Sequence, residues 1–290
     1  MTAALAARAV GLVPHRDRPL AHELAQHTAA WLVDHDVEVR VPAALAPGAG
    51  LAAHAHADAD FASGLDLVIA LGGDGTMLYA VQLVYPAPVP VMGVNVGILG
   101  YLSELEPKEL EGWLPRLLAG DYEISERTML AVDVESAGPA RGTWYALNEA
   151  VVEKLRAGHL IYLDVSINGT AFTTYAADGL IVSTPTGSTA YSFSAGGPIV
   201  SPDLRCTVLT PISAHMLFDR SLVLAEHEEI AFVVANGRNV ALTIDGRELG
   251  ELGSGDRVRC QIAPEPLRVV SVRPRDFHQI LKTKFSLPDR

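Results

Sequence analysis

One segment in the first third of the chain restricts the folds open to it, because a buried strand, a glycine turn and a helix start follow one another directly. The apolar run Leu67–Leu71 leads into Gly72-Gly73-Asp74-Gly75-Thr76, and helix-like sequence continues over Met77–Val81. An apolar run that ends in glycines is typical of a buried strand entering a tight turn. The order strand, turn and helix predicts an α/β layer around a parallel sheet.

The same turn has the composition of a phosphate-binding site. Glycine allows positive φ angles and a close approach of a ligand to the backbone. Backbone N–H groups in such a turn, at a helix N-terminus, suit phosphate. Asp74, the only carboxylate among them, suits a metal-bound phosphate or a hydroxyl that must lose its proton. Ligands of open α/β sheets bind beyond the carboxyl ends of strands. A glycine turn without a ligand is the alternative.

The flanking sequence extends this pattern to an α/β domain over residues 1–125. Strands are expected at Ala9–Val13, Val37–Val41 and Val89–Val94, the last entering a second glycine-rich strand end at Gly93–Leu102. A helix is expected over Pro19–Asp34, where the apolar spacing predicts one buried face. The residues at that spacing are Leu20, Leu24, Thr28, Trp31 and Leu32. A further helix should start at Pro107 and stop at Gly120.

The pattern changes near residue 126 to short strands and turn dipeptides, which predicts a β-rich, sandwich-like domain over residues 126–270. The turn dipeptides are Asn168-Gly169, Asn236-Gly237 and Asp245-Gly246. Residues 271–290 are expected to form a short helix that packs back on the first domain. The expected strands are Leu130–Val134, Leu163–Ile167, Gly179–Val182, Glu229–Val234, Val240–Ile244 and Val258–Ile262.

Charge and cysteine content exclude several classes of partner and compartment. The formal net charge of −12 argues against a general nucleic-acid or anionic-membrane surface. Only Cys206 and Cys260 occur, which fits a reducing cytosol without a disulfide framework. Met1–Val10 lacks the apolar core of a signal peptide. The uncharged stretch Gly75–Ser103 is broken by prolines and glycines, so it is not expected to cross a membrane.

Two His and two Asp residues alternate within the alanine-rich stretch Pro42–Gly64. They are His54, His56, Asp58 and Asp60. A metal cluster is one interpretation of this spacing. A solvated loop or frayed helix is favoured, because no further motif supports a metal site.

A second stretch, Asp178–Pro198, carries the most chemical information. A strand opens into eight hydroxyl-bearing residues between Ser183 and Ser194 and then a Gly-Gly-Pro turn. Hydroxyls both donate and accept hydrogen bonds, which suits ribose and carboxamide groups. Tyr191 offers a ring that can pack on a base. A Ser/Thr-rich surface loop is the alternative.

Together the two stretches resemble one family. Gly-Gly-Asp-Gly-Thr alone is shared by NAD kinases and diacylglycerol-type lipid kinases, and phosphofructokinases carry a close relative of it. The run from Asp178 through Ser-Thr-Pro-Thr-Gly-Ser-Thr-Ala-Tyr-Ser to Gly-Gly-Pro resembles NAD kinases, of the bacterial, actinobacterial type. Asn148-Glu149 matches the family's Asn-Glu pair. The resemblance implies an α/β N-terminal domain with a parallel sheet plus a β-rich C-terminal domain.

The resemblance also implies the reaction, which is phosphoryl transfer to the 2′-hydroxyl of the adenosine ribose of NAD, giving NADP. NADH is a further acceptor, ATP or polyphosphate is the donor, and Mg²⁺ or another divalent metal assists. Asp74 is the implied catalytic residue. A homodimer or homotetramer in the cytoplasm is expected, with no nucleic acid or membrane partner. The implied binding residues are Gly72, Gly73, Gly75, Thr76, Asn148, Glu149, His159, Ala176, Asp178, Thr189, Ala190, Tyr191, Ser194 and Arg247.

Two positions depart from the family pattern. Tyr79 stands where many bacterial members have Arg, which bears on phosphate affinity. Ala176 stands where some members have Arg, which bears on the choice between NAD and NADH. Two alternatives to an NAD kinase stay open. One is a catalytically weak paralogue that binds NAD(P) as a sensor, and the other is a lipid kinase of the same superfamily.

Overall fold

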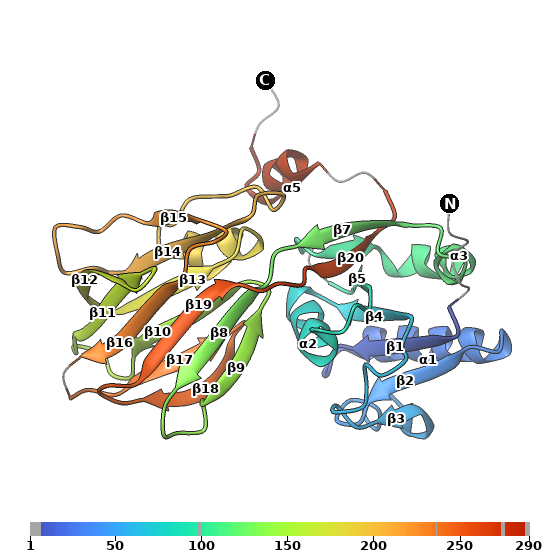
Figure 1. Ribbon diagram of the computed structural model, residues 1–290. Coiled ribbons are helices and arrows are strands. Elements are labelled where there is room, and N and C mark those ends of the chain that lie inside the picture. Colours follow the sequence, from blue (N-terminus) through green and yellow to red (C-terminus); the bar gives the residue numbers. More distant parts are fainter. Residues whose placement is uncertain (1–6, 98–99, 236, 274–275, 288–290) are drawn as a thin grey trace. The chain divides into compact units, whose positions relative to one another are not determined.

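The computed structural model describes residues 7–97, 100–235, 237–273 and 276–287 of the chain (Figure 1). The chain divides into two compact units. The first unit combines Met1–Glu126 with Leu267–Arg290, and the second is Arg127–Pro266.

The first unit is built on one eight-stranded sheet, and the strand that carries the glycine turn lies at its centre. The strand order is β3-β2-β1-β4-β5-β20-β7, and β6 pairs with β5 outside this path. Neighbouring strands β2, β1, β4 and β5 are parallel, so their carboxyl ends share one edge. The strands are β1 (Ala9–Pro14), β2 (Glu38–Pro42), β3 (Ala55–His56), β4 (Leu67–Gly72), β5 (Val91–Asn95), β6 (Ser103–Leu105), β7 (Glu123–Arg127) and β20 (Leu267–Ser271).

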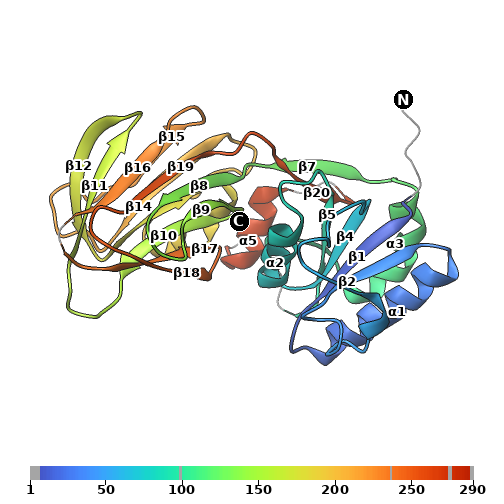
Figure 2. The same ribbon diagram turned by 60° about the horizontal axis from the view of Figure 1, so that its bottom comes forward.

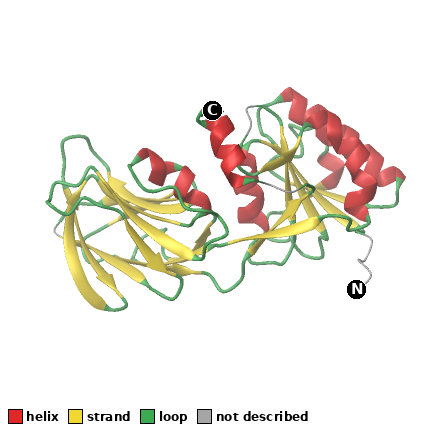
Figure 3. Ribbon diagram, turned by 90° about the horizontal axis from the view of Figure 1, so that it is seen from above, coloured by secondary structure: helices red, strands yellow, loops and turns green. Residues whose placement is uncertain are grey.

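Helices cover both faces of this sheet. Figures 2 and 3 show α1 and α3 on one face and α2 on the other. This is the arrangement expected for right-handed crossovers between parallel strands. The helices are α1 (Pro19–Asp34), α2 (Asp74–Val84), α3 (Pro107–Leu118) and α5 (Phe277–Lys284), with a short 3₁₀ turn, η1 (Ala52–His54).

The predicted bounds of α1 are confirmed, but its predicted buried face is partly wrong. Leu20 is 53% exposed. Alanines supply much of the buried stripe instead, and their small side chains let the helix approach the sheet closely. The buried residues of α1 are Ala21, Ala25, Thr28, Ala29 and Leu32.

The second unit is mainly strands (Figure 3), and its two antiparallel six-stranded sheets pack face to face around one core cluster. The sheet orders are β15-β14-β13-β10-β17-β18 and β12-β11-β16-β19-β8-β9. The strands are β8 (Leu130–Glu135), β9 (Gly142–Ala146), β10 (Glu149–Lys154), β11 (Ile161–Ile167), β12 (Thr170–Ala177), β13 (Gly179–Ser183), β14 (Cys206–Ile212), β15 (Leu222–Ala225), β16 (Ile230–Ala235), β17 (Val240–Ile244), β18 (Arg247–Leu252) and β19 (Arg257–Ile262).

An apolar core joins the inner faces of these two sheets. It includes Leu163 and Phe232 from one sheet and Val152 and Leu242 from the other. Two short helical segments follow β13, namely η2 (Thr186–Thr189) and α4 (Tyr191–Ser194). The fold class expected from the sequence, an α/β domain plus a β-rich domain, is therefore confirmed.

The turn dipeptides mark real reversals of the chain. Asn168 and Asp245 have φ angles of 51° and 48°, and the glycine after each also has a positive φ. The Asn236-Gly237 turn lies partly outside the described residues. Within the described part, no helix is long and apolar enough to span a membrane.

Candidate functional site

The glycine turn joins the carboxyl end of β4 to the start of α2. Gly73 is the extended residue that precedes the helix, and α2 begins at Asp74, earlier than the sequence pattern suggests. The backbone N–H of Thr76 donates to the carbonyl of Gly73 at 3.0 Å. A Cβ on Gly72 would overlap the Thr76 side chain, so the turn depends on glycine there. The N-terminus of α2, with the positive end of the helix dipole, therefore lies at the carboxyl end of β4.

Asp74 is held in place by the loop that follows β5. Its two carboxylate oxygens accept the backbone N–H groups of Tyr101 at 3.0 Å and Leu102 at 3.1 Å. A Cβ on Gly100 would overlap the same carboxylate, so Gly100 permits the close approach. The second glycine-rich strand end thus contacts the first, although Ile98 and Leu99 lie outside the described residues. These two hydrogen bonds orient the carboxylate, and each of its oxygens can still accept a hydrogen bond from another donor.

A cavity of about 580 Å³ opens at this turn. Arg16, Arg18 and Lys284 line it together with Gly73 and Asp74. Three side chains of fixed positive charge thus face a helix N-terminus and its backbone N–H groups. That combination suits a polyanionic ligand such as a phosphate chain.

Sequence reasoning missed these basic residues. His15-Arg16-Asp17-Arg18 follows the first predicted strand directly, so the rule that parallel strands meet at one edge could have found that run. Burial lowers the pKa of His15, and the charge of Arg18 lowers it further. The imidazole therefore adds no fixed charge at neutral pH. Arg18 donates to the carbonyl of Val96, which fixes its position beside the turn.

Tyr79 lies on α2 in the wall of the same cavity. Its hydroxyl donates to the carboxylate of Asp58 at 3.4 Å. The position that carries Arg in many family members is therefore neutral here, and its polar end is directed at a carboxylate.

In the second unit, Asp245 organises the Asn148-Glu149 pair. Its carboxylate accepts the backbone N–H groups of Leu147 at 2.7 Å, Asn148 at 2.8 Å and Glu149 at 3.1 Å. Burial raises the pKa of Asp245 to about 6, against the lowering effect of these three bonds. Asp245 is thus a positioning residue for the start of β10.

Glu149 is the most unusual carboxylate of the unit. Its side chain is buried, and Oε2 has no hydrogen-bond partner among the described residues. Burial raises the pKa of Glu149 to about 8, the charge of Asp245 adds to the rise, and the backbone N–H of Tyr191 opposes it. A buried acceptor without a donor is costly. A ligand that brings hydroxyl donors would satisfy it.

The hydroxyl run after β13 divides into two groups. Some hydroxyls hold the turn itself: Thr184 donates to the carbonyl of Leu147 at 2.5 Å, and Ser188 accepts from the N–H of Val200 at 2.9 Å. Thr184 and Ser188 are not among the predicted binding residues, and these bonds give them a structural role in the turn. In contrast, the Thr186 hydroxyl is buried without a partner in the described part.

Tyr191 and Asp178 lie close to this turn. The Tyr191 ring is 38% exposed, and its hydroxyl donates to Glu153 at 3.4 Å. Burial raises the pKa of Tyr191, and nearby carboxylates, including those of Glu153 and Asp178, add to the effect. Asp178 pairs with Lys154 at 2.7 Å. The exposed ring can stack on a base, and Asp178 already has a cationic partner.

The remaining predicted residues lie at different places in the second unit. His159 is exposed and lines a separate hollow of about 480 Å³ with Arg156 and Arg238. The Arg247 guanidinium lies 5.6 Å from the centre of the Trp144 ring. Ala176 lies on β12, and its carbonyl accepts the N–H of His215 at 2.7 Å. Thr189 ends η2, Ala190 follows it, and Ser194 ends α4.

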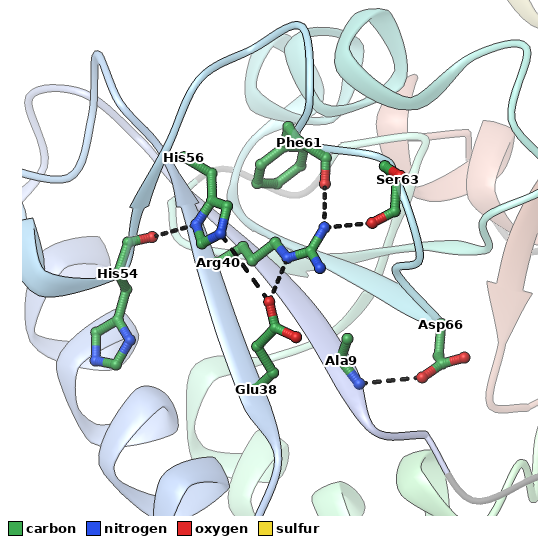
Figure 4. Close-up of polar contacts among 8 residues, drawn as sticks. All are labelled: Ala9, Glu38, Arg40, His54, His56, Phe61, Ser63 and Asp66. Atoms are coloured by element: carbon green, nitrogen blue, oxygen red, sulfur yellow. Dashed lines mark hydrogen bonds and ion pairs between the residues drawn. The ribbon is translucent and has the colours of Figure 1, made fainter.

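In the His/Asp stretch of the first unit, His54 and His56 lie among local contacts (Figure 4), whereas Asp58 accepts the Tyr79 hydroxyl. Arg40 donates to Glu38 at 2.6 Å and to the carbonyl of Phe61 at 3.4 Å. The His56 ring contacts the carbonyl of His54 at 3.1 Å. Nowhere in the described ranges do three His, Cys, Asp or Glu side chains converge as a metal site.

Comparisons with known proteins identify relatives over nearly the whole chain. A family model described as the ATP-NAD kinase N-terminal domain matches residues 10–122, and one described as the C-terminal domain matches residues 147–272. A protein of Heliobacterium modesticaldum named NAD kinase is 40% identical over 277 residues, which cover 95% of this chain and 97% of the relative.

Two solved structures share the fold. The crystal structure of yeast NADH kinase complexed with NADH has a TM-score of 0.87 at 26% identity, over 98% of this chain and 89% of that one. An NAD kinase from Archaeoglobus fulgidus in complex with ATP has a TM-score of 0.74 at 23% identity, over 97% and 99%. At 23% identity, the similarity to the Archaeoglobus fulgidus structure concerns the fold alone.

Proposed function

The chain belongs to the NAD kinase family, and from this premise we propose how its own residues perform phosphoryl transfer from ATP to the 2′-hydroxyl of the adenosine ribose of NAD. It is a phosphotransferase that acts on NAD. Phosphoryl transfer depends mainly on positioning and on neutralising phosphate charge.

Asp74 carries the proposal for the first unit. Its carboxylate is fixed by two backbone N–H groups at the N-terminus of α2, in a cavity lined by Arg16, Arg18 and Lys284. The basic side chains and the amides around Gly73 and Gly75 bind the donor phosphates. Asp74 orients the attacking hydroxyl and accepts its proton as a general base.

Glu149 carries the proposal for the second unit. Its unpartnered Oε2 accepts a ribose hydroxyl, and the hydrogen bonds to the ligand favour the ionised carboxylate. Asn148 contributes its side-chain amide beside it, and Tyr191 stacks on the base. Asp245 acts indirectly by holding the Asn148-Glu149 backbone.

We propose that a divalent metal binds together with the phosphate donor. Mg²⁺ in such sites is usually held by one or two carboxylates, waters and substrate phosphates, without a dedicated protein cage. Asp74 fits that description because both of its oxygens can accept further partners. When bound, the metal would supply neutralisation of phosphate charge.

Several narrower statements stay proposals. We infer ATP as the donor from the family's description, with polyphosphate as the alternative, and a cytoplasmic location from the two free, buried cysteines. Exposed apolar side chains such as Leu217 support a homodimer or homotetramer, which light scattering tests. The actinobacterial type stays a prediction, because the relatives found come from diverse bacteria.

One coupled assay tests the function. Purified protein is incubated with NAD, MgCl₂ and either ATP or polyphosphate, and NADP is measured with an NADP-specific dehydrogenase. NADP formation is the expected result. Tight NAD binding without turnover would support the sensor alternative, for which the orientation of Tyr79 towards Asp58 is the favouring observation.

A Glu149→Ala variant should raise KM for NAD about tenfold or more and leave KM for ATP nearly unchanged.

A further inference from the structure

The cavity at Asp74 contains one side chain from the opposite end of the chain. Lys284 is the last residue of α5, the C-terminal helix drawn in red in Figure 1. It lines the cavity together with Gly73, Asp74 and Gly75. Nothing in the sequence pattern around Lys284 indicates a ligand contact, so its place in this cavity is a structural finding.

Lys284 contacts the side chain of a residue whose backbone holds Asp74. Its ammonium nitrogen lies 4.4 Å from the centre of the Tyr101 ring. Tyr101 is also the residue whose backbone N–H binds Asp74 at 3.0 Å. Lys284 therefore lies over the loop that fixes Asp74. A cation–π contact at a solvent-accessible site is weak, so the ammonium group can leave the ring for a stronger anionic partner.

The charge of the cavity gives such a group a role. A triphosphate needs cationic partners, and α2 supplies none at position 79, because Tyr79 is neutral and donates to Asp58. Arg16 and Arg18 enter from the loop after β1. Lys284 also lines the cavity, and it comes from the C-terminal helix α5.

Helix α5, which carries this cation, buries little of its surface. No residue of α5 is buried, and its start is fixed by Asp276, whose side chain accepts the N–H groups of His278 and Gln279. An element with little buried apolar surface opens at low free-energy cost. An added charged contact would therefore change its stability measurably.

We propose that Lys284 binds the phosphate chain of the donor nucleotide and that donor binding stabilises α5 against the cavity at Asp74. The inference rests on the proposed function, since it names a further binding residue for the same donor. Lys284 supplies from the C-terminus a phosphate-binding charge that position 79 lacks.

The kinetic test uses Lys284→Ala, Lys284→Arg and the control Lys282→Ala. Lys282 lies two residues earlier, so it projects from a different side of the helix while having the same side chain. In Lys284→Ala, KM for ATP should rise about tenfold, as expected for the loss of a charged hydrogen bond. KM for NAD should stay within twofold. Lys284→Arg should recover most of the loss, and Lys282→Ala should resemble the wild type.

The second readout does not need turnover. Hydrogen exchange of the α5 amides is measured in the wild type with a non-hydrolysable ATP analogue and MgCl₂, with NAD alone, and without ligand. The analogue should slow exchange severalfold in the wild type but not in Lys284→Ala. NAD alone should leave α5 unchanged.

Two results would overturn the inference. One is an unchanged KM for ATP in Lys284→Ala, and the other is α5 exchange that the analogue does not slow. Failure of the proposed function would look different, because the wild type would then make no NADP in the coupled assay. The exchange experiment would still decide whether α5 responds to the nucleotide.

Discussion

Replacing Glu149 with Gln should stabilise the protein at neutral and alkaline pH while weakening NAD binding. The carboxyl is buried, one of its oxygens has no partner in the described part of the chain, and its pKa is raised to about 8. The unfolded chain ionises this group near 4.5. The folded state therefore binds the proton more tightly than the unfolded state, and stability is lost as pH rises from about 4.5 to about 8.

The magnitude follows from the two pKa values. One pKa unit corresponds to about 1.4 kcal/mol, so the ionisable Glu149 costs on the order of 1 kcal/mol at pH 5 and on the order of 4 kcal/mol at pH 8. Gln has nearly the same shape and does not titrate. The gap in unfolding free energy between Glu149→Gln and wild type should therefore widen by about 3 kcal/mol over this range.

The assay is urea denaturation of both proteins at pH 5 and pH 8, followed by a signal from the second unit. Asp245 also has a raised pKa, of about 6, so its stabilising contribution also falls with rising pH. It is present in both proteins and largely cancels from the difference. Glu248→Gln, an exposed position on β18, controls for the loss of one negative charge. A gap of equal size at the two pH values would refute a raised pKa at Glu149.

Three further predictions concern the cavity and the acceptor. Tyr79→Arg should lower KM for ATP severalfold, because an arginine can bind phosphate oxygens bidentately; unchanged KM and kcat would show that position 79 does not meet the donor. Gly100→Ala should abolish most turnover because its Cβ would displace the Asp74 carboxylate, whereas Gly112→Ala, with open space around its Cβ, should leave turnover intact; near-normal turnover in Gly100→Ala would contradict the packing. The wild type should use NADH as well as NAD. Ala176→Arg should change the ratio of kcat/KM for NADH to kcat/KM for NAD by a factor equivalent to about 1–3 kcal/mol. A wild-type preference for NAD beyond about a thousandfold would exclude Ala176 as its cause.

Local patterns were sufficient to predict much of the first unit. The bounds of α1 and the strand before the glycine turn follow from apolar spacing, and Pro19 marks the helix start. The sequence pattern places the start of α2 after Thr76, which is too late, because glycines at 73 and 75 have low helix propensity. In the structure, Gly73 precedes the first helical residue and Asp74 occupies it.

Long-range contacts account for what the sequence could not predict. Strand β20 joins the sheet of the first unit beside β5, a pairing across most of the chain that no local pattern encodes. The entry of Lys284 into the Asp74 cavity depends on that return. The function of Asp245 as an acceptor for three backbone N–H groups also requires the three-dimensional structure.

The central claim is that Asp74 accepts the proton of the ribose hydroxyl, and the Asp74→Asn variant tests it most directly. The change removes the base and one of two amide contacts, at a cost of about 1–3 kcal/mol in stability. NADP formation with ATP and NAD is measured alongside calorimetric NAD binding and thermal unfolding. The account predicts that kcat falls by about 10²–10⁴ while the protein stays folded and binds NAD as before. A folded variant with near-normal kcat would contradict it.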